Sequence, residues 1–229
     1  MITVANGLVT VAGEVSLTTL DIGGTNVTST AAELNILDGV TATATEINQV
    51  DGEVVKTAGK ESIWIPAAAM YPSTTNPCSD LTQVETTALR PDLKCLDFAT
   101  GADDFAQFSI AFPKSWNEGT ITFQPFWTVT GTNTGTVAWG LAGIAVSNDD
   151  SINTAFGTIV VTTALAHSGT SNDLMVSVES GAVTIAGSPA ANDLCFFQVN
   201  RDVSADAQSG DARLLGIKLF FTTDAKNDS

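Results

Sequence analysis

The fold is decided by Ala106-Gln107-Phe108-Ser109-Ile110-Ala111-Phe112 and Ile121-Thr122-Phe123-Gln124-Pro125-Phe126-Trp127, in which apolar residues recur at every second position. Successive side chains of a strand point to opposite faces, so this period predicts strands with one buried face. Six further runs share this character, at 137–141, 159–163, 174–178, 183–185, 194–199 and 214–221. About eight to ten short antiparallel strands over residues 62–229 predict a β-sandwich of jelly-roll type.

Two details refine this prediction. Pro125 has no N–H group for a sheet ladder, which indicates an edge strand or a bulge at its position. The alternation also places Phe126, Phe196 and Phe220 on the outer faces of the sheets. A monomer rarely exposes such a set, so either loops cover these rings or they form a subunit interface.

The composition excludes several classes of partner. Charged residues make up only 15% of the 229, and the net charge is −16, with no Lys or Arg in the first 55 positions. Such a field repels phosphate backbones and anionic lipids, so we expect neither nucleic-acid binding nor membrane insertion. Solubility in salt explains the acidity most simply; a calcium site, for example at Asn148-Asp149-Asp150, is the alternative.

The cysteines indicate a chain that folds in a reducing compartment. Cys78, Cys95 and Cys195 are odd in number and widely spaced, which is typical neither of a disulfide framework nor of a zinc site. Cys95 and Cys195 lie in apolar runs and are predicted to be buried. The N-terminus lacks the pattern of a secretory signal, so we expect assembly in a cytoplasm.

Residues 30–54 contain an internal repeat with a period of 13, in which six of ten positions are identical. The copies are 30–39, read TAAELNILDG, and 43–52, read TATEINQVDG. Each begins with Thr-x-x-Glu, a capping box, and ends with the glycine that favours a left-handed helix end. The predicted capping residues are Thr30, Glu33 and Gly39 in the first copy, and Thr43, Glu46 and Gly52 in the second.

Each copy therefore encodes about two helical turns, too few to be stable alone in water. The apolar residues Leu34 and Leu37, and likewise Ile47 and Val50, lie three apart on one side of each helix. This stripe has to be buried. We expect equivalent stripes of a homotrimer to meet around a threefold axis. Docking onto the chain's own C-terminal domain is the alternative.

Residues 1–29 read as short strands punctuated by Asn6-Gly7, Gly13 and Gly23-Gly24, with too few large apolar groups to enclose a core. The predicted organisation is therefore an N-terminal β segment (1–29), a short repeat stalk and linker (30–61) and a sandwich head (62–229).

Signals for catalysis are weak. His167 is the single histidine and lies in a predicted loop. The sequence contains no Gly-x-Ser-x-Gly motif, which would position a nucleophilic serine, and no glycine-rich loop with a lysine before a helix, which would bind phosphate. The acidic candidates for glycoside cleavage, namely Asp103-Asp104, Glu118 and Asp149-Asp150, lie in predicted turns, whereas this chemistry needs carboxylates on opposite walls of a cleft. We expect no enzyme, no cofactor and no resident metal.

The segment 20–41, read LDIGGTNVTSTAAELNILDGVT, resembles the TAAELNxLDGVT repeats of tailed-bacteriophage fibre and appendage proteins. In that family such repeats form trimeric stalks that carry globular tips. The resemblance covers about 35 residues and implies a homotrimer on the virion surface. It carries over no functional residue, because the motif is architectural.

Two functions follow. In the first, the chain is a head fibre or capsid decoration protein, with residues 1–29 bound to other virion proteins and the sandwich projecting outward. About 25 residues of helix reach at most about 40 Å, which is short for a tail-fibre shaft. In the second, the chain is a tail fibre or tailspike tip that binds a host glycan or protein. Its expected contact residues are Trp116, Thr130 and Asn133.

Overall fold

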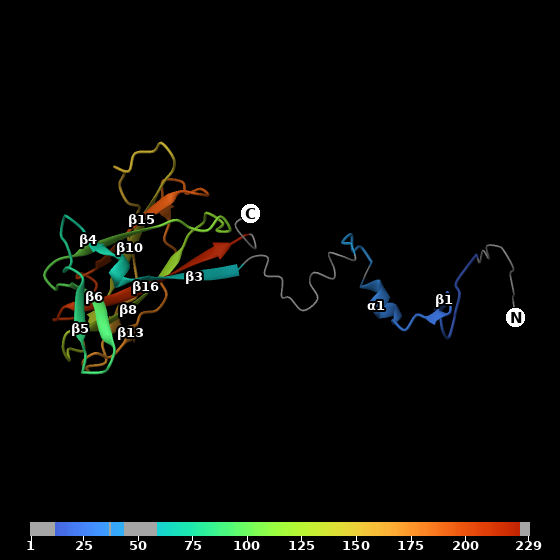
Figure 1. The fold of residues 1–229 in the computed structure, drawn as a ribbon, viewed down its shortest axis with the longest axis horizontal. Helices are drawn as coiled ribbons and strands as arrows, with labels where there is room; N and C mark the ends of the chain where they lie inside the picture. The colour runs from blue at the N-terminus through green and yellow to red at the C-terminus, as the bar shows by residue number, and fades with distance from the viewer. Residues whose placement is uncertain (1–11, 37, 44–58, 225–229) are drawn as a thin grey trace. The chain divides into compact units, whose positions relative to one another are not determined.

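The computed structural model describes residues 12–36, 38–43 and 59–224, within two units, Met1–Val55 and Lys56–Ser229 (Figure 1). None of the helices in these residues is long and apolar enough to cross a membrane.

In its described residues, the first unit holds a small hairpin and one short helix, α1 (Ala31–Asn35). Strand β1 (Asp21–Ile22) pairs antiparallel with β2 (Thr25–Asn26) through a turn of Gly23 and Gly24, whose φ values are +66° and +87°. A turn with two positive φ values favours glycine at both positions. The expected strand around Val15 and Leu17 does not form: positions 12–20 contain no strand, and both side chains are more than half exposed.

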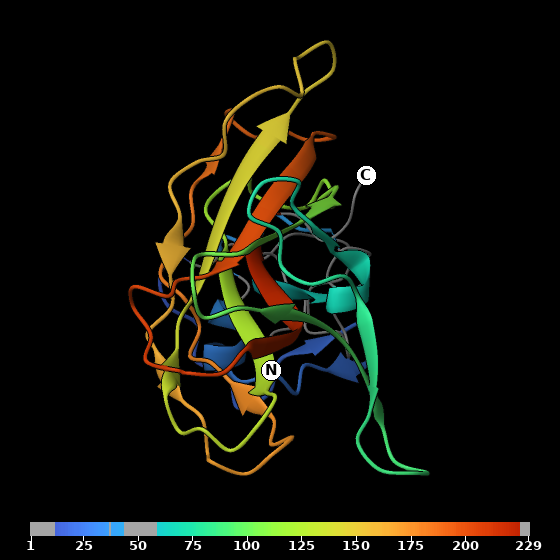
Figure 2. The ribbon, with the colours of Figure 1, turned by 90° about the vertical axis from the view of Figure 1, so that its left-hand side faces the viewer.

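The second unit is built on two six-stranded sheets. Sheet I consists of β11 (Val160–Val161), β10 (Trp139–Val146), β15 (Leu194–Arg201), β7 (Phe105–Ile110) and β4 (Tyr71–Pro72), with β14 (Ile185–Ala186) parallel to β10. Sheet II consists of β13 (Met175–Val176), β8 (Thr122–Val129), β16 (Ala212–Thr223), β6 (Asp92–Phe98) and β5 (Thr82–Glu85), with β3 (Gly59–Pro66) also on β16. The neighbouring strands β10, in yellow, and β15, in orange, are visible in Figure 2.

Short elements complete the unit. A 3-10 turn, η1 (Ala67–Ala69), follows β3, and β9 (Thr136–Val137) pairs with β12 (Leu165–Ala166) outside the two large sheets.

Inner faces of both sheets contribute to one core. Trp127 of sheet II and Trp139 of sheet I have ring centroids 6.5 Å apart, and Phe98 of sheet II meets Trp139 edge to face at 5.1 Å. All three side chains are fully buried. Truncating one such aromatic to alanine costs about 3–5 kcal/mol. Because the core lies between two sheets, the predicted mainly-β sandwich is confirmed.

The sequence predicts an edge strand or a bulge at Pro125, and the structure has a bulge beside it, on the neighbouring strand β16. The register of β8 on β16 shifts between Leu214 and Gly216, next to the pair formed by Pro125 and Ile217. The Pro125 carbonyl accepts a hydrogen bond from Ser177 N at 3.0 Å, so its missing N–H faces the side of the short strand β13. Gly216 is required here, because a Cβ atom at that position would lie 2.6 Å from the Ile65 carbonyl oxygen.

The outer-face aromatic residues are partly covered. Trp64 of β3 packs edge to face on Phe126 at 5.0 Å, and the ammonium groups of Lys60 and Lys218 lie over the Phe220 ring. Phe196 is half-buried on the outer face of sheet I. Side chains of the same chain thus account for Phe126 and Phe220.

Candidate functional site

The predicted capping box is formed at the start of α1. The Thr30 hydroxyl accepts a hydrogen bond from Glu33 N at 3.3 Å, and Glu33 Oε2 accepts one from Thr30 N at 2.7 Å. The bond from the Thr30 backbone, reinforced by the Thr30 hydroxyl, lowers the pKa of Glu33 from its ordinary value. The helix start is therefore fixed by reciprocal bonds between two side chains and two backbone amides.

The helix is shorter than predicted. It ends at Asn35 with Ile36 as the C-cap, and Asp38 N donates to Asn35 O at 3.1 Å. Gly39 does adopt the left-handed conformation, with φ of +81°, but it follows the helix end by several residues. The prediction that Gly39 directly closes a two-turn helix is therefore wrong, because the chain leaves the helix before reaching it.

The apolar side chains of Leu34 and Ile36 are exposed to solvent. Leu34 is 46% exposed and Ile36 is 74% exposed, and α1 contains no buried residue. Thr43 lies outside any helix in the described part of the chain. Leu37, Glu46, Ile47, Val50 and Gly52 lie outside the described residues, so the second capped helix and most of the apolar stripe stay predictions.

The predicted recognition loop, residues 130–135, lies in the sandwich and exposes Thr130 and Asn133. Its backbone carbonyls contact side chains of the sandwich. Gln208 Nε2 donates to the Asn133 carbonyl at 3.0 Å, and His167 Nδ1 lies 3.1 Å from the same oxygen. A Cβ atom on Gly135 would lie 2.3 Å from the Ala207 carbonyl oxygen, so glycine allows the close approach of the 207–208 backbone.

A buried arginine fixes the neighbouring loop. Arg201 is fully buried and forms a two-point ion pair with Asp206, at 2.5 Å and 3.1 Å. Its remaining N–H groups donate to the carbonyls of Phe98, Ala99, Gln208 and Gly210. A guanidinium with all its donors used holds these chain segments in one geometry. The sequence showed no sign of it, since its acceptors come mostly from backbone carbonyls.

The expectation that Trp116 is an exposed contact residue is wrong. Trp116 is only 4% exposed, with its ring centroid 4.3 Å from that of Phe112. The segment is tied to β16 by a bridge between Trp116 and Thr223 and by a bond from Asn117 N to Thr222 O. Burial among aromatic residues therefore removes Trp116 from the candidate recognition surface.

His167 and the acidic candidates bind local backbone. His167 is 3% exposed, and apart from Asn133 its Nδ1 meets Gly169 N at 3.2 Å. The carboxylates accept from backbone amides of nearby loops: Asp103 from Val203, Asp104 from Ala99, Glu118 from Ala191 and Asp150 from Ser147. In the described ranges these contacts bring no two of the acidic candidates to opposite walls of a cleft.

The cysteines are buried thiols, as predicted for Cys95 and Cys195. Burial raises the pKa of Cys78 and of Cys195 to about 12. Within residues 12–36, 38–43 and 59–224, no group of three or more His, Cys, Asp or Glu side chains is placed to hold a metal ion.

No protein-family profile and no curated protein sequence matches the chain. Among solved structures, it is similar to a family 35 carbohydrate-binding module from Clostridium thermocellum, with 8% identity, a TM-score of 0.39 and coverage of 69% of this chain and 97% of that one. It is also similar to the family 11 module from Clostridium thermocellum, with 11% identity, a TM-score of 0.35 and coverage of 74% and 91%. The C-terminal family 6 module of a marine laminarinase from Zobellia galactanivorans matches with 11% identity, a TM-score of 0.33 and coverage of 69% and 98%.

Proposed function

We propose that this chain is a structural protein of a tailed-phage particle, a trimeric head fibre or capsid decoration protein that displays a β-sandwich at the virion surface. The observation that carries the proposal is the capped helix α1, whose apolar residue Leu34 stays 46% exposed in the single chain. A helix of five residues is too short to persist by its own hydrogen bonds. Its formation therefore calls for a partner that covers Leu34.

We expect this partner to be the same repeat segment, residues 30–54, of an identical chain. The capping box recurs 13 residues later, so each copy of the chain brings two apolar stripes of the same design. Closed rotational symmetry lets identical stripes cover one another without leaving an open end. The resemblance to phage stalk repeats favours three copies.

Residues 1–29 are proposed to attach the trimer to other virion proteins. Within the described part, Val15, Leu17 and Ile22 are 55%, 59% and 65% exposed, and the hairpin of β1 and β2 is only two residues deep. An isolated hairpin of this size is marginal in water. Pairing with another protein would bury these side chains, with assembly taking place in the host cytoplasm.

The runner-up is a tail fibre or tailspike tip that binds a host receptor. Its support is the 130–135 loop, which exposes Thr130 and Asn133 on a backbone whose Asn133 and Gly135 carbonyls accept hydrogen bonds from Gln208. A recognition loop binds more tightly when it is fixed beforehand, because less flexibility is lost on binding.

Immunogold labelling of intact particles with antibodies against the sandwich separates the two roles. Gold over the capsid is the result expected for a head fibre or decoration protein. Gold confined to the tail tip would overturn that assignment and favour the receptor-binding role. Particles that bind no gold would show that the chain is not part of the virion surface.

A further inference from the structure

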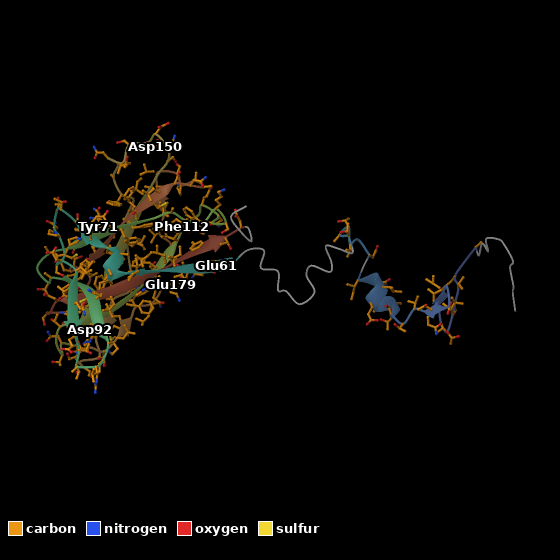
Figure 3. The ribbon with its side chains drawn as sticks, in the orientation of Figure 1. Glu61, Tyr71, Asp92, Phe112, Asp150 and Glu179 are labelled. Atoms are coloured by element: carbon orange, nitrogen blue, oxygen red, sulfur yellow. The ribbon has the colours of Figure 1, made fainter. Side chains whose placement is uncertain are left out.

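A hollow of about 260 Å³ lies on the outer face of sheet I. Strand register gives it a floor: Gln107 of β7, Phe196 of β15 and Ile144 of β10 share the outer face, and Tyr71 of β4 pairs directly with Gln107. Tyr71 stands 48% exposed at one side of the hollow, while Ile144 is almost fully buried. Figure 3 labels Tyr71, and labels Asp150 in the loop that follows β10.

That loop, residues 147–159, supplies a wall of the hollow with Ile152, Thr154 and Phe156. It is held in place by a bond from Gly157 N to Gly143 O at 3.1 Å, and the Thr154 hydroxyl donates to Ser151 O at 2.9 Å. Ile152 is nevertheless 68% exposed. The wall is therefore formed before any ligand arrives, and its apolar surface faces water.

The polar groups of the hollow are few. In the portion of the chain that the structure describes, no hydrogen bond is made by the side-chain amide of Gln107, which offers two donors and an acceptor. The side-chain amide of Gln198, the cross-strand neighbour of Gln107 on β15, likewise makes no hydrogen bond within the described residues. Neither amide is among the buried polar groups that lack a partner, so both reach water, and the amide of Gln107, which lines the hollow, can exchange that water for the hydroxyl group of a ligand.

We propose that this hollow binds one pyranose ring of a neutral glycan. A sugar ring presents an apolar C–H face, which fits the rings of Tyr71 and Phe196, and hydroxyl groups, which fit the Gln107 amide. The lining contains no Lys, Arg, Asp or Glu, so nothing there compensates a charged ligand. Its volume is below the roughly 300–1,000 Å³ of sites for drug-sized ligands, which limits the occupant to one ring.

This inference goes beyond the assembly role, because the hollow lies wholly within the sandwich of one chain. Failure of the trimer would leave it intact, and failure of sugar binding would leave the virion role intact. A single ring in an open hollow is expected to bind weakly, with a dissociation constant on the order of 1 mM.

The test is ligand-observed NMR titration of the full chain with the methyl glycosides of glucose, galactose, mannose and N-acetylglucosamine, and with the charged methyl glucuronide. At least one neutral glycoside should bind saturably, and the glucuronide should bind at least tenfold more weakly. Tyr71→Ala and Gln107→Ala should each weaken binding about tenfold or more. Tyr71→Phe, which keeps the ring, should change it less than about threefold.

Leu174→Ala is the matched control, since it removes a 58% exposed apolar side chain next to β13 of sheet II. Urea unfolding of every variant shows whether the sandwich is intact. The proposal is overturned if no neutral glycoside saturates, if the glucuronide binds equally well, or if folded Tyr71→Ala and Gln107→Ala variants bind like the unmodified chain.

Discussion

Arg201 and Asp206 form a two-point ion pair from which water is excluded, with side chains 0% and 4% exposed. They lie five residues apart on either side of a turn, so the pair closes the loop that follows β15. The same guanidinium bonds the carbonyls of Phe98 and Gly210, which connects that loop to the ends of two strands of sheet II. The Gln208 carbonyl also accepts from Arg201, and the Gln208 side chain donates to the Asn133 carbonyl, so the buried ion pair supports the 130–135 loop through Gln208.

Replacing Arg201 by Met should lower the free energy of unfolding by about 3–5 kcal/mol, because it leaves Asp206 buried without its partner. Urea unfolding followed by circular dichroism measures the loss. Lys60→Ala is the control: Lys60 is half exposed in its pair with Glu179, so its loss should cost less than about 1 kcal/mol. Equal effects of the two substitutions would contradict the structural role of Arg201.

Replacing Leu34 by Asp should dissociate the proposed trimer, because it places a charge on the shared apolar stripe. Light scattering coupled to size-exclusion chromatography measures the mass. Asn35→Asp adds the same charge to the same exposed helix beside the stripe and should leave the oligomer intact. A Leu34→Asp variant of unchanged mass would show that this side chain lies outside the interface.

The capping box gives the N-terminal segment a dependence on pH. Glu33 has a folded-state pKa below its ordinary value, so its stabilising effect is fully present above the ordinary pKa of glutamate. It is lost as the pH falls through the lowered value. The proposed trimer of the unmodified chain should therefore weaken in acid more steeply than that of a Glu33→Gln variant, as measured by sedimentation between about pH 6 and pH 3. An identical dependence of association on pH in the two proteins would contradict a stabilising role of the Thr30–Glu33 capping box.

The three thiols should be unreactive in the folded protein. With the pKa of Cys78 and Cys195 raised to about 12 by burial, almost no thiolate exists at pH 8. A colorimetric thiol reagent should therefore detect less than one thiol in the native chain, and three after denaturation in guanidinium. Fast labelling of the native protein would mean that the sandwich opens readily.

Alternation predicted the strands best where one face packs on the core, as in β7, β8, β15 and β16. It missed β3 and β6, where Lys60, Glu61 and Lys94 interrupt the apolar pattern on exposed faces. It also missed β5, whose four residues include only one large apolar side chain, Val84. Local chemistry also predicted the capping box, because Thr30 and Glu33 need no distant partner.

Contacts between distant segments were not predictable from the sequence. Trp116 carries no sign that Phe112 and β16 enclose it. The outer-face hollow joins Tyr71, from a two-residue strand, to Ile152, from a loop, and neither belongs to a periodic run. Such sites depend on which segments the sheet brings together, which periodicity alone does not specify.

Sedimentation equilibrium of the unmodified full chain, over a wide range of dilute concentrations, tests most directly whether the exposed stripe at Leu34 is an interface. We predict a mass of three times the 23.7 kDa chain. A folded species that remains a single chain throughout that range would contradict it.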